Sequence, residues 1–228
     1  AIGIDAINKL EIGKLTSFKS VELYGRDEVI TFGEELRGIK LFDYYDDDPD
    51  YYNDDVPDVL CLQLKEILNG CKKLTSFGLE RCELNAECDT IIHQLLNNQQ
   101  LNEVALDKWS GRDMSRFLEP LSKLENLKSL DIVWLITENV SKDFETLLKR
   151  NTLQTLTVWW GSREVMNTLN SCCHEMTTLK KLKLRDCWYI NLLTNLHLLQ
   201  LQSFHIGFLC EEGVNNIAKV ISSWSDLR

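Results

Sequence analysis

The chain has no apolar run that approaches the roughly 18–20 residues needed for a membrane-spanning helix. Its first 14 residues, AIGIDAINKLEIGK, lack the basic start and apolar core of a signal peptide. Glycine and proline are scarce, with 11 and 3 among 228 residues. We therefore expect no membrane segment and a cytoplasmic location.

Basic residues are also in short supply, since 25 lysines and arginines face 35 acidic residues and the net charge is −10. One segment, Phe42–Asp58, carries eight aspartates and no lysine or arginine, so the rest of the chain is nearly neutral. Binding to a nucleic-acid backbone relies on many basic contacts. We expect no nucleic-acid partner.

The sequence contains none of the common catalytic signatures, such as a glycine-rich phosphate loop, HExxH or GxSxG. Its four histidines are scattered, and the run Cys172–Glu175 (CCHE) has no second ligand pair for zinc. That run is better interpreted as a helix end with partly buried thiols. The sequence therefore predicts no enzyme, no cofactor and no metal site.

Cysteine, by contrast, is well represented. Eight cysteines are spread along the whole chain rather than concentrated in a small domain. Such a distribution is typical of reduced, buried thiols and favours the cytosol. A glycosylation-type triplet at Asn139–Ser141 is weak evidence against a location in the cytosol.

The dominant signal is an internal repeat of the form apolar, two variable, apolar, one variable, apolar. Six copies start 27, 26, 26, 26 and 22 residues apart. They are Leu74–Leu79, Leu101–Leu106, Leu127–Ile132, Leu153–Val158, Leu179–Leu184 and Leu201–Ile206. Two further matches lie upstream, at Leu36–Leu41 and Phe18–Leu23.

The segments between these hexads have helical periodicity. In each segment, apolar residues fall on one face of the expected helix: Ile91, Ile92, Leu95 and Leu96; Phe117, Leu118, Leu121 and Leu124; Phe144, Leu147 and Leu148; and Val214, Ile217, Ala218 and Ile221. Each unit is thus predicted to be a short strand followed by a helix, and neighbouring units must stack to bury their apolar sides. Strands about 4.8 Å apart and bulkier helices would bend such a stack into a horseshoe.

This pattern resembles the leucine-rich repeat of the ribonuclease-inhibitor-like class. The best match is LTSFGLERCEL, Leu74–Leu84, with Cys82 at the ninth position, which Cys187 also occupies in its unit. The resemblance implies an α/β solenoid with parallel strands on the concave face and helices on the convex face. It also implies that a cysteine at this position satisfies backbone groups of the loop.

The resemblance covers residues 36–228, and residues 1–35 are expected to be an irregular or capping repeat. The unit that begins at Leu36 is about a dozen residues longer than its neighbours, and the acidic segment follows its strand. We therefore predict an acidic loop insertion at about residues 42–58. A calcium loop is disfavoured because the EF-hand glycine and closing glutamate are missing; a contact for a basic partner stays open.

The candidate site follows from the two residues after each hexad, which face the concave side near one rim. Aromatic and basic residues gather there, and such residues are common anchors of protein interfaces. The candidate ligand-binding residues are Trp134, Trp159, Trp160, Phe208, Arg81, Lys108 and Arg185. The alternative is that the rings fold over the strand ends, as we expect Trp109 and Trp188 to do.

The expected function is recognition of a protein partner or a microbial ligand on the concave face. The resemblance is greatest to the C-terminal sensor region of an intracellular immune receptor of the NLR type, whose repeats sense ligands or hold the receptor inactive. The alternative is the substrate-recognition domain of an F-box-type ubiquitin ligase, whose repeats are also about 26 residues long and contain cysteine.

Overall fold

The computed structural model describes residues 20–24, 32, 34–42, 56–80, 82, 84–98, 100–107, 114–133 and 141–207. The chain divides into two compact units, residues 1–111 and 112–228. The division expected after residue 35 remains a prediction. Among the described residues before residue 36, Ser20–Tyr24 form a strand that pairs with the next strand in the chain.

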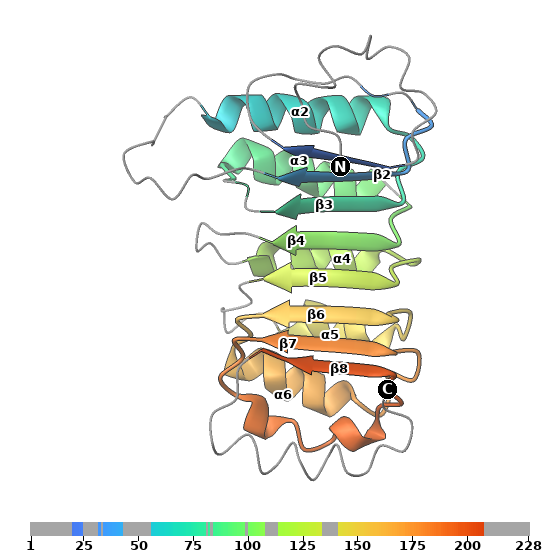
Figure 1. Ribbon diagram of the computed structural model, residues 1–228, viewed down its shortest axis with the longest axis vertical. Coiled ribbons are helices and arrows are strands. Elements are labelled where there is room, and N and C mark those ends of the chain that lie inside the picture. Colours follow the sequence, from blue (N-terminus) through green and yellow to red (C-terminus); the bar gives the residue numbers. More distant parts are fainter. Residues whose placement is uncertain are drawn as a thin grey trace. The chain divides into compact units, whose positions relative to one another are not determined.

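The described part of the first unit has four strands, all parallel and in chain order. The strands are β1 (Ser20–Tyr24), β2 (Gly38–Phe42), β3 (Ser76–Glu80) and β4 (Glu103–Asp107); the helices are α2 (Val56–Gly70) and α3 (Ala86–Asn98). In Figure 1, α3 lies behind these strands and α2 is drawn beyond β1.

The second unit repeats this arrangement with four more parallel strands in chain order. The strands are β5 (Ser129–Val133), β6 (Thr155–Trp159), β7 (Lys181–Arg185) and β8 (Ser203–Ile206). The helices are α4 (Leu118–Lys123), α5 (Ser141–Lys149) and α6 (Arg163–Cys172). Two 3₁₀ turns, Ile190–Leu192 and Leu196–Leu198, replace the helix between β7 and β8, where the repeat shortens to 22 residues.

All eight predicted hexads form strands in the same phase, because each strand begins at the third residue of its hexad. In β7, Leu182 and Leu184 are buried while Lys181 and Lys183 are exposed. This is the period-2 alternation of a strand with one covered face. The predicted helical groups of α3, α4 and α5 are buried as well, and the predicted group at 214–221 lies outside the described residues.

Parallel strands alternating with helices are compatible with the predicted solenoid. The assignment to the leucine-rich repeat class stays a prediction. Within the described part of the chain, no helix is both long and apolar enough to cross a membrane.

The cysteines depart in part from the expectation of reduced thiols. A disulfide joins Cys61 on α2 to Cys88 on α3, so that expectation is wrong for this pair. The two half-cystines are 27 residues apart, one repeat length, which places them at matching points of adjacent helices. The other described cysteines are free and buried: Cys71, Cys82, Cys172, Cys173 and Cys187.

Cys82 and Cys187 make equivalent contacts in their two units. The Cys82 thiol donates to the carbonyl oxygens of Leu41 and Glu80 at 3.6 and 3.5 Å. Cys187 donates to the corresponding carbonyls of Val158 and Arg185 at 3.6 and 3.3 Å. Each thiol thus links the end of its own strand to the end of the preceding one.

The acidic segment lies between β2 and α2 in the chain. Phe42 is the last residue of β2 and Val56 is the first residue of α2. Residues 43–55 lie outside the described part, so their assignment as an inserted loop stays a prediction.

Candidate aromatic and basic surface

The best-defined candidate site lies where β6 and β7 end, in the second unit. Trp159 is the last residue of β6 and is paired in register with Arg185, the last residue of β7. The guanidinium carbon of Arg185 lies 4.2 Å from the centre of the Trp159 ring. This is cation–π geometry, which fixes the arginine side chain and covers one face of the half-buried indole.

Gly207, the residue directly after β8, leaves space for the Arg185 side chain because it has no side chain of its own. A side-chain carbon added at Gly207 would lie 3.3 Å from both Cα and Cγ of Arg185. The Gly207 N–H also donates to the Leu184 carbonyl at 2.9 Å, which continues the ladder beyond β8. Arg185 is therefore held between a glycine and a tryptophan.

Trp160, directly after β6, has an unusual backbone conformation with φ of 57°. For a residue with a side chain, the left-handed region costs roughly 1–2 kcal/mol, and glycine adopts it freely. The Trp160 N–H donates to the Arg185 carbonyl at 3.0 Å, and the ring is 39% exposed. A large ring thus occupies a position where glycine would fit better, and it faces solvent.

The residue after Trp160 lies close to α6. Gly161 is buried, and a side-chain carbon there would lie 2.6 Å from Cε of Met166 on α6. The chain must therefore pass close to the start of α6 immediately after β6. The neighbouring Ser162 accepts a hydrogen bond from the Val165 N–H at 3.3 Å and caps this helix.

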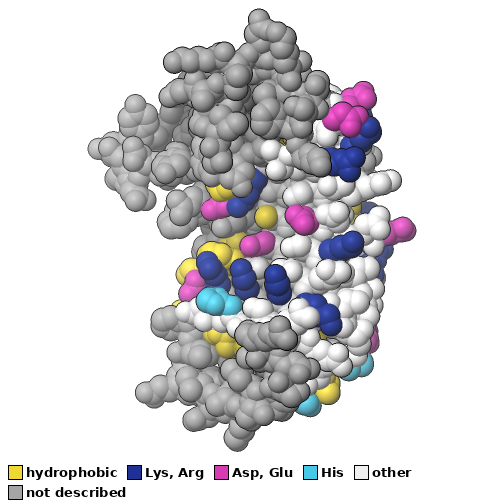
Figure 2. Space-filling model, turned by 45° about the vertical axis from the view of Figure 1, so that its right-hand side comes forward, with side chains coloured by type: hydrophobic (Ala, Val, Ile, Leu, Met, Phe, Trp, Pro, Cys, Tyr) yellow, Lys and Arg dark blue, Asp and Glu magenta, His cyan; other side chains and the backbone are white. Residues whose placement is uncertain are grey.

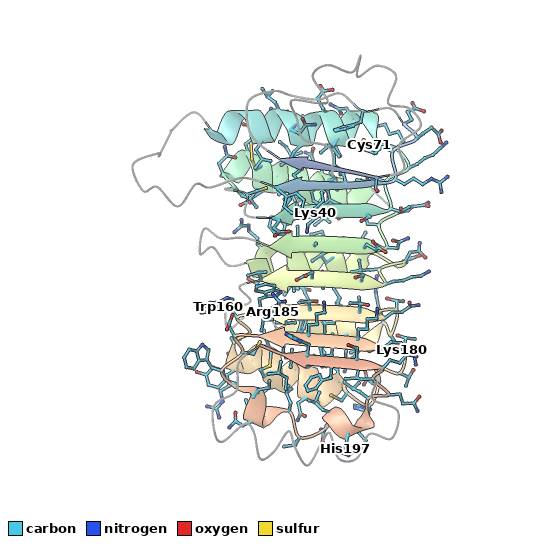
Figure 3. All side chains as sticks on the ribbon, viewed as in Figure 1. Lys40, Cys71, Trp160, Lys180, Arg185 and His197 are labelled. Atoms are coloured by element: carbon cyan, nitrogen blue, oxygen red, sulfur yellow. A yellow bond between two sulfur atoms is a disulfide. The ribbon has the colours of Figure 1, made fainter. Side chains whose placement is uncertain are left out.

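Two more exposed aromatic residues follow the end of β7. Trp188 and Tyr189 are 68% and 44% exposed, and Cys187 just before them is tied to the strand ends through its thiol. The expectation that Trp188 folds over the strand ends is wrong, because most of its ring is exposed. We call Trp160, Trp188 and Tyr189 the aromatic edge. Figure 3 shows Trp160 and Arg185 at the same end of their strands.

Part of the predicted site can be compared with the structure. Trp159, Trp160 and Arg185 come together at one end of β6 and β7. The other candidates, Trp134, Phe208, Arg81 and Lys108, lie outside the described residues, as does Trp109. Tyr189 was missed, because it lies beyond the two positions after the hexad that the sequence argument used.

The basic residues of β7 were missed for a similar reason. Lys181 and Lys183 occupy the variable positions inside the hexad, and both are exposed. Figure 2 shows lysine and arginine side chains side by side with a histidine next to them on this face. In register, Lys183 lies beside His205 of β8 and Thr157 of β6.

The thiols near this site are poor nucleophiles. Burial raises the pKa of Cys187 to about 11 and that of Cys173 to about 12. Because the thiolate is the reactive form, such thiols react slowly at neutral pH. α6 ends at Cys172, as expected for a helix end with buried thiols. Among the described residues, no group of three or more His, Cys, Asp or Glu side chains is arranged to hold a metal ion.

No protein-family model matches the sequence, and no curated protein matches it either. The function proposed below therefore rests on the residues of this chain alone.

Proposed function

We propose that the chain is a protein-recognition module whose second unit binds a partner through the aromatic edge and Arg185. One observation carries this proposal: Trp160, Trp188 and Tyr189 are all exposed at the ends of adjacent strands, beside a fixed arginine. Tryptophan, tyrosine and arginine are the residues most enriched at the energetic centres of protein interfaces.

The backbone of Trp160 supports the same conclusion. Its φ of 57° carries a cost that glycine at this position would avoid. A costly backbone at an exposed ring is typical of positions kept for binding rather than for stability. The parallel strands provide the rigid scaffold that a preorganised contact surface needs.

Within this proposal, the chain is the sensing or autoinhibitory leucine-rich repeat region of an NLR-type innate immune receptor, acts without a cofactor, and is cytoplasmic. The support is the repeat pattern and the five free, buried thiols. The Cys61–Cys88 disulfide argues against a fully reducing compartment. An F-box-type ligase would use the same kind of surface.

Quantitative affinity capture from cells tests the recognition role. The bait carries Trp160→Gly, Trp188→Ala and Tyr189→Ala; glycine is chosen at 160 because it suits the backbone there. We expect a discrete set of captured proteins to fall at least about tenfold, in line with the loss of interface anchors. The thermal midpoint should stay within a few degrees, because these rings are exposed.

The matched control replaces two equally exposed apolar side chains away from the edge. Leu62 and Leu198 are each 48% exposed. If Leu62→Ala with Leu198→Ala reduces capture as much as the edge variant does, the proposal is wrong. Reading the transcript on both sides of this segment tests the receptor assignment. An upstream GxxxxGK[ST] loop supports it, and an upstream F-box would replace it with the ligase.

A further inference from the structure

The exposed face of β7 carries three cationic side chains in a line. Lys181, Lys183 and Arg185 alternate with the buried Leu182 and Leu184, so all three side chains leave the same face of the strand. Alternate residues of a strand repeat about every 6.6–6.8 Å. We call these three residues the cation row.

The cation row is not neutralised by the described residues around it. None of its three members forms an ion pair with a described residue, whereas Lys40, Lys65, Lys73, Lys123 and Lys149 all do. The paired positions on β6 are Thr155, Thr157 and Trp159, and those on β8 begin with Ser203 and His205. No acidic residue is therefore adjacent to the row on either flanking strand.

The nearest described carboxylates lie farther away or at the end of the row. Asp131 of β5 is paired with Thr157, so one whole strand separates it from Lys183. Asp186 follows Arg185 at the turn and has a φ of 51°. Three like charges at this spacing repel one another, and a ligand that brings negative charge would relieve that repulsion.

We propose that the cation row binds an extended peptide segment with carboxylates on alternate residues. This inference rests on the proposed recognition function and specifies the partner's chemistry. Alternate side chains of an extended peptide repeat at the same spacing of about 6.6–6.8 Å as the row, so three carboxylates can face three cations at once. Ser203 and Thr155 flank Lys181 with small hydroxyl side chains, which allow close approach.

Two features favour a carboxylate peptide over a nucleic acid. The arginine already covers one face of the Trp159 ring, so the row offers no free ring face at that position for a base to stack on. The row also has only three cations, whereas binding of a nucleic-acid backbone relies on many basic contacts. A short acidic segment meets the local charge of the row without that requirement.

Fluorescence anisotropy with labelled synthetic peptides on the full chain tests the proposal. The probe alternates aspartate and threonine over seven residues. One reference peptide has the same composition with the aspartates contiguous, and another has asparagine at each aspartate. We expect the alternating peptide to bind tightest, and binding to weaken several-fold between about 20 and about 300 mM salt because screening shortens the reach of exposed charges.

Charge-removing variants locate the site. Lys181→Gln with Lys183→Gln should weaken binding of the alternating peptide about tenfold, in keeping with the loss of two charge contacts. Lys123→Gln with Lys149→Gln removes the same charge from the same unit, at lysines paired with Glu119 and Glu145. This control should stay within about twofold, since those residues are on helices α4 and α5.

Several results would overturn the inference. Equal weakening in both double variants would show a non-specific charge effect, and equal binding of all three peptides would show that spacing is irrelevant. Tighter binding of a single-stranded oligonucleotide of similar length would assign the row to nucleic acid. If the peptide does not bind while protein capture still depends on the aromatic edge, only the peptide proposal is wrong. If the peptide binds the cation row while capture does not depend on the aromatic edge, only the role of the edge is wrong.

Discussion

On the exposed face of the strands in each unit, a glycine lies beside a long cationic side chain. The charge of that side chain is paired with a carboxylate in the first unit and with no described carboxylate in the second. In the first unit, Lys40 of β2 lies across Gly78 of β3, where an added side-chain carbon would lie 2.8 Å from its Cγ. The Lys40 ammonium lies 4.5 Å from the Phe42 ring centre and 2.5 Å from Oε2 of Glu80. The cation is therefore paired within the unit.

In the second unit, Arg185 lies beside Gly207 and stacks on Trp159, but no described carboxylate pairs with it. The numbers of charged residues in the two units agree with this local difference. Residues 1–111 include 22 acidic and 11 basic residues, and residues 112–228 include 13 acidic and 14 basic residues. Lys40 on the exposed strand face of the first unit is thus paired with a carboxylate, and Lys181, Lys183 and Arg185 of the second unit form no ion pair with a described residue.

Reduction of the Cys61–Cys88 disulfide should have the largest effect that distinguishes the two units. Cys61–Cys88 closes a loop with a sequence separation of 27 in the first unit, and no disulfide occurs among the described residues of the second. Chain-entropy arguments assign about 3–4 kcal/mol to a loop of this length. Reduction should raise hydrogen exchange in α2 and α3 and leave β6 and β7 unchanged.

Mass-spectrometric hydrogen exchange with and without a reductant measures this directly. Cys61→Ala with Cys88→Ala is the matched variant, and adding reductant to it should change nothing further. Equal acceleration in the two units would show that they do not unfold separately, and the contrast between them would then not extend to stability.

A second, smaller effect should appear at alkaline pH. Burial raises the pKa of Cys71 in the first unit to about 11, and those of Cys173 and Cys187 in the second to about 12 and about 11. Between pH 9 and these values the folded state holds protons that the unfolded state has lost. The thiols thus contribute their full stability below pH 9, and this contribution is lost as the pH rises.

Each such thiol adds a slope of at most about 1.4 kcal/mol per pH unit. Urea midpoints between pH 8 and pH 10.5 should therefore fall less steeply in Cys173→Ala with Cys187→Ala than in Cys71→Ala, because two buried thiols are removed rather than one. The slope with pH is the readout, since each substitution also lowers the baseline. Identical slopes in both variants and the parent would contradict the assignment.

The repeat pattern alone predicted the strands, and a physical reason explains why. The apolar positions of a hexad such as Leu179–Leu184 must all be buried, and a period of two allows only one phase. The helical spacing of apolar residues between the hexads predicted the buried faces of α3, α4 and α5. It did not predict the 3₁₀ turns after β7, because their residues, such as Ile190 and Leu196, are apolar like those of a helix.

The candidate site was predicted less well, because exposure and pairing depend on neighbours that the sequence does not show. Nothing in the sequence distinguishes paired Lys40 from unpaired Lys183; both occupy the same hexad position. The exposed Trp188 and the disulfide partner of Cys61 were equally hidden. The 27-residue separation of Cys61 and Cys88, one repeat length, was the signal that would have found that disulfide.

The smallest test compares the two glycines. Gly78→Ala should push the Lys40 side chain away and cost the partly buried Lys40–Glu80 pair, which is worth about 1 kcal/mol. Gly207→Ala should press on the backbone and Cγ of Arg185 and loosen its stacking on Trp159. Both should lower the thermal midpoint by no more than about 4 °C.

Salt distinguishes the two causes. At about 1 M salt the screening length is about 3 Å, so the deficit of Gly78→Ala should shrink because salt screens the half-exposed ion pair. The deficit of Gly207→Ala should persist, since it arises from crowding against a half-buried arginine. Thermal melts of both variants at low and high salt provide the measurement. If both deficits shrink together, Arg185 is held by charge alone, and the second unit resembles the first more closely than its unpaired cations indicate.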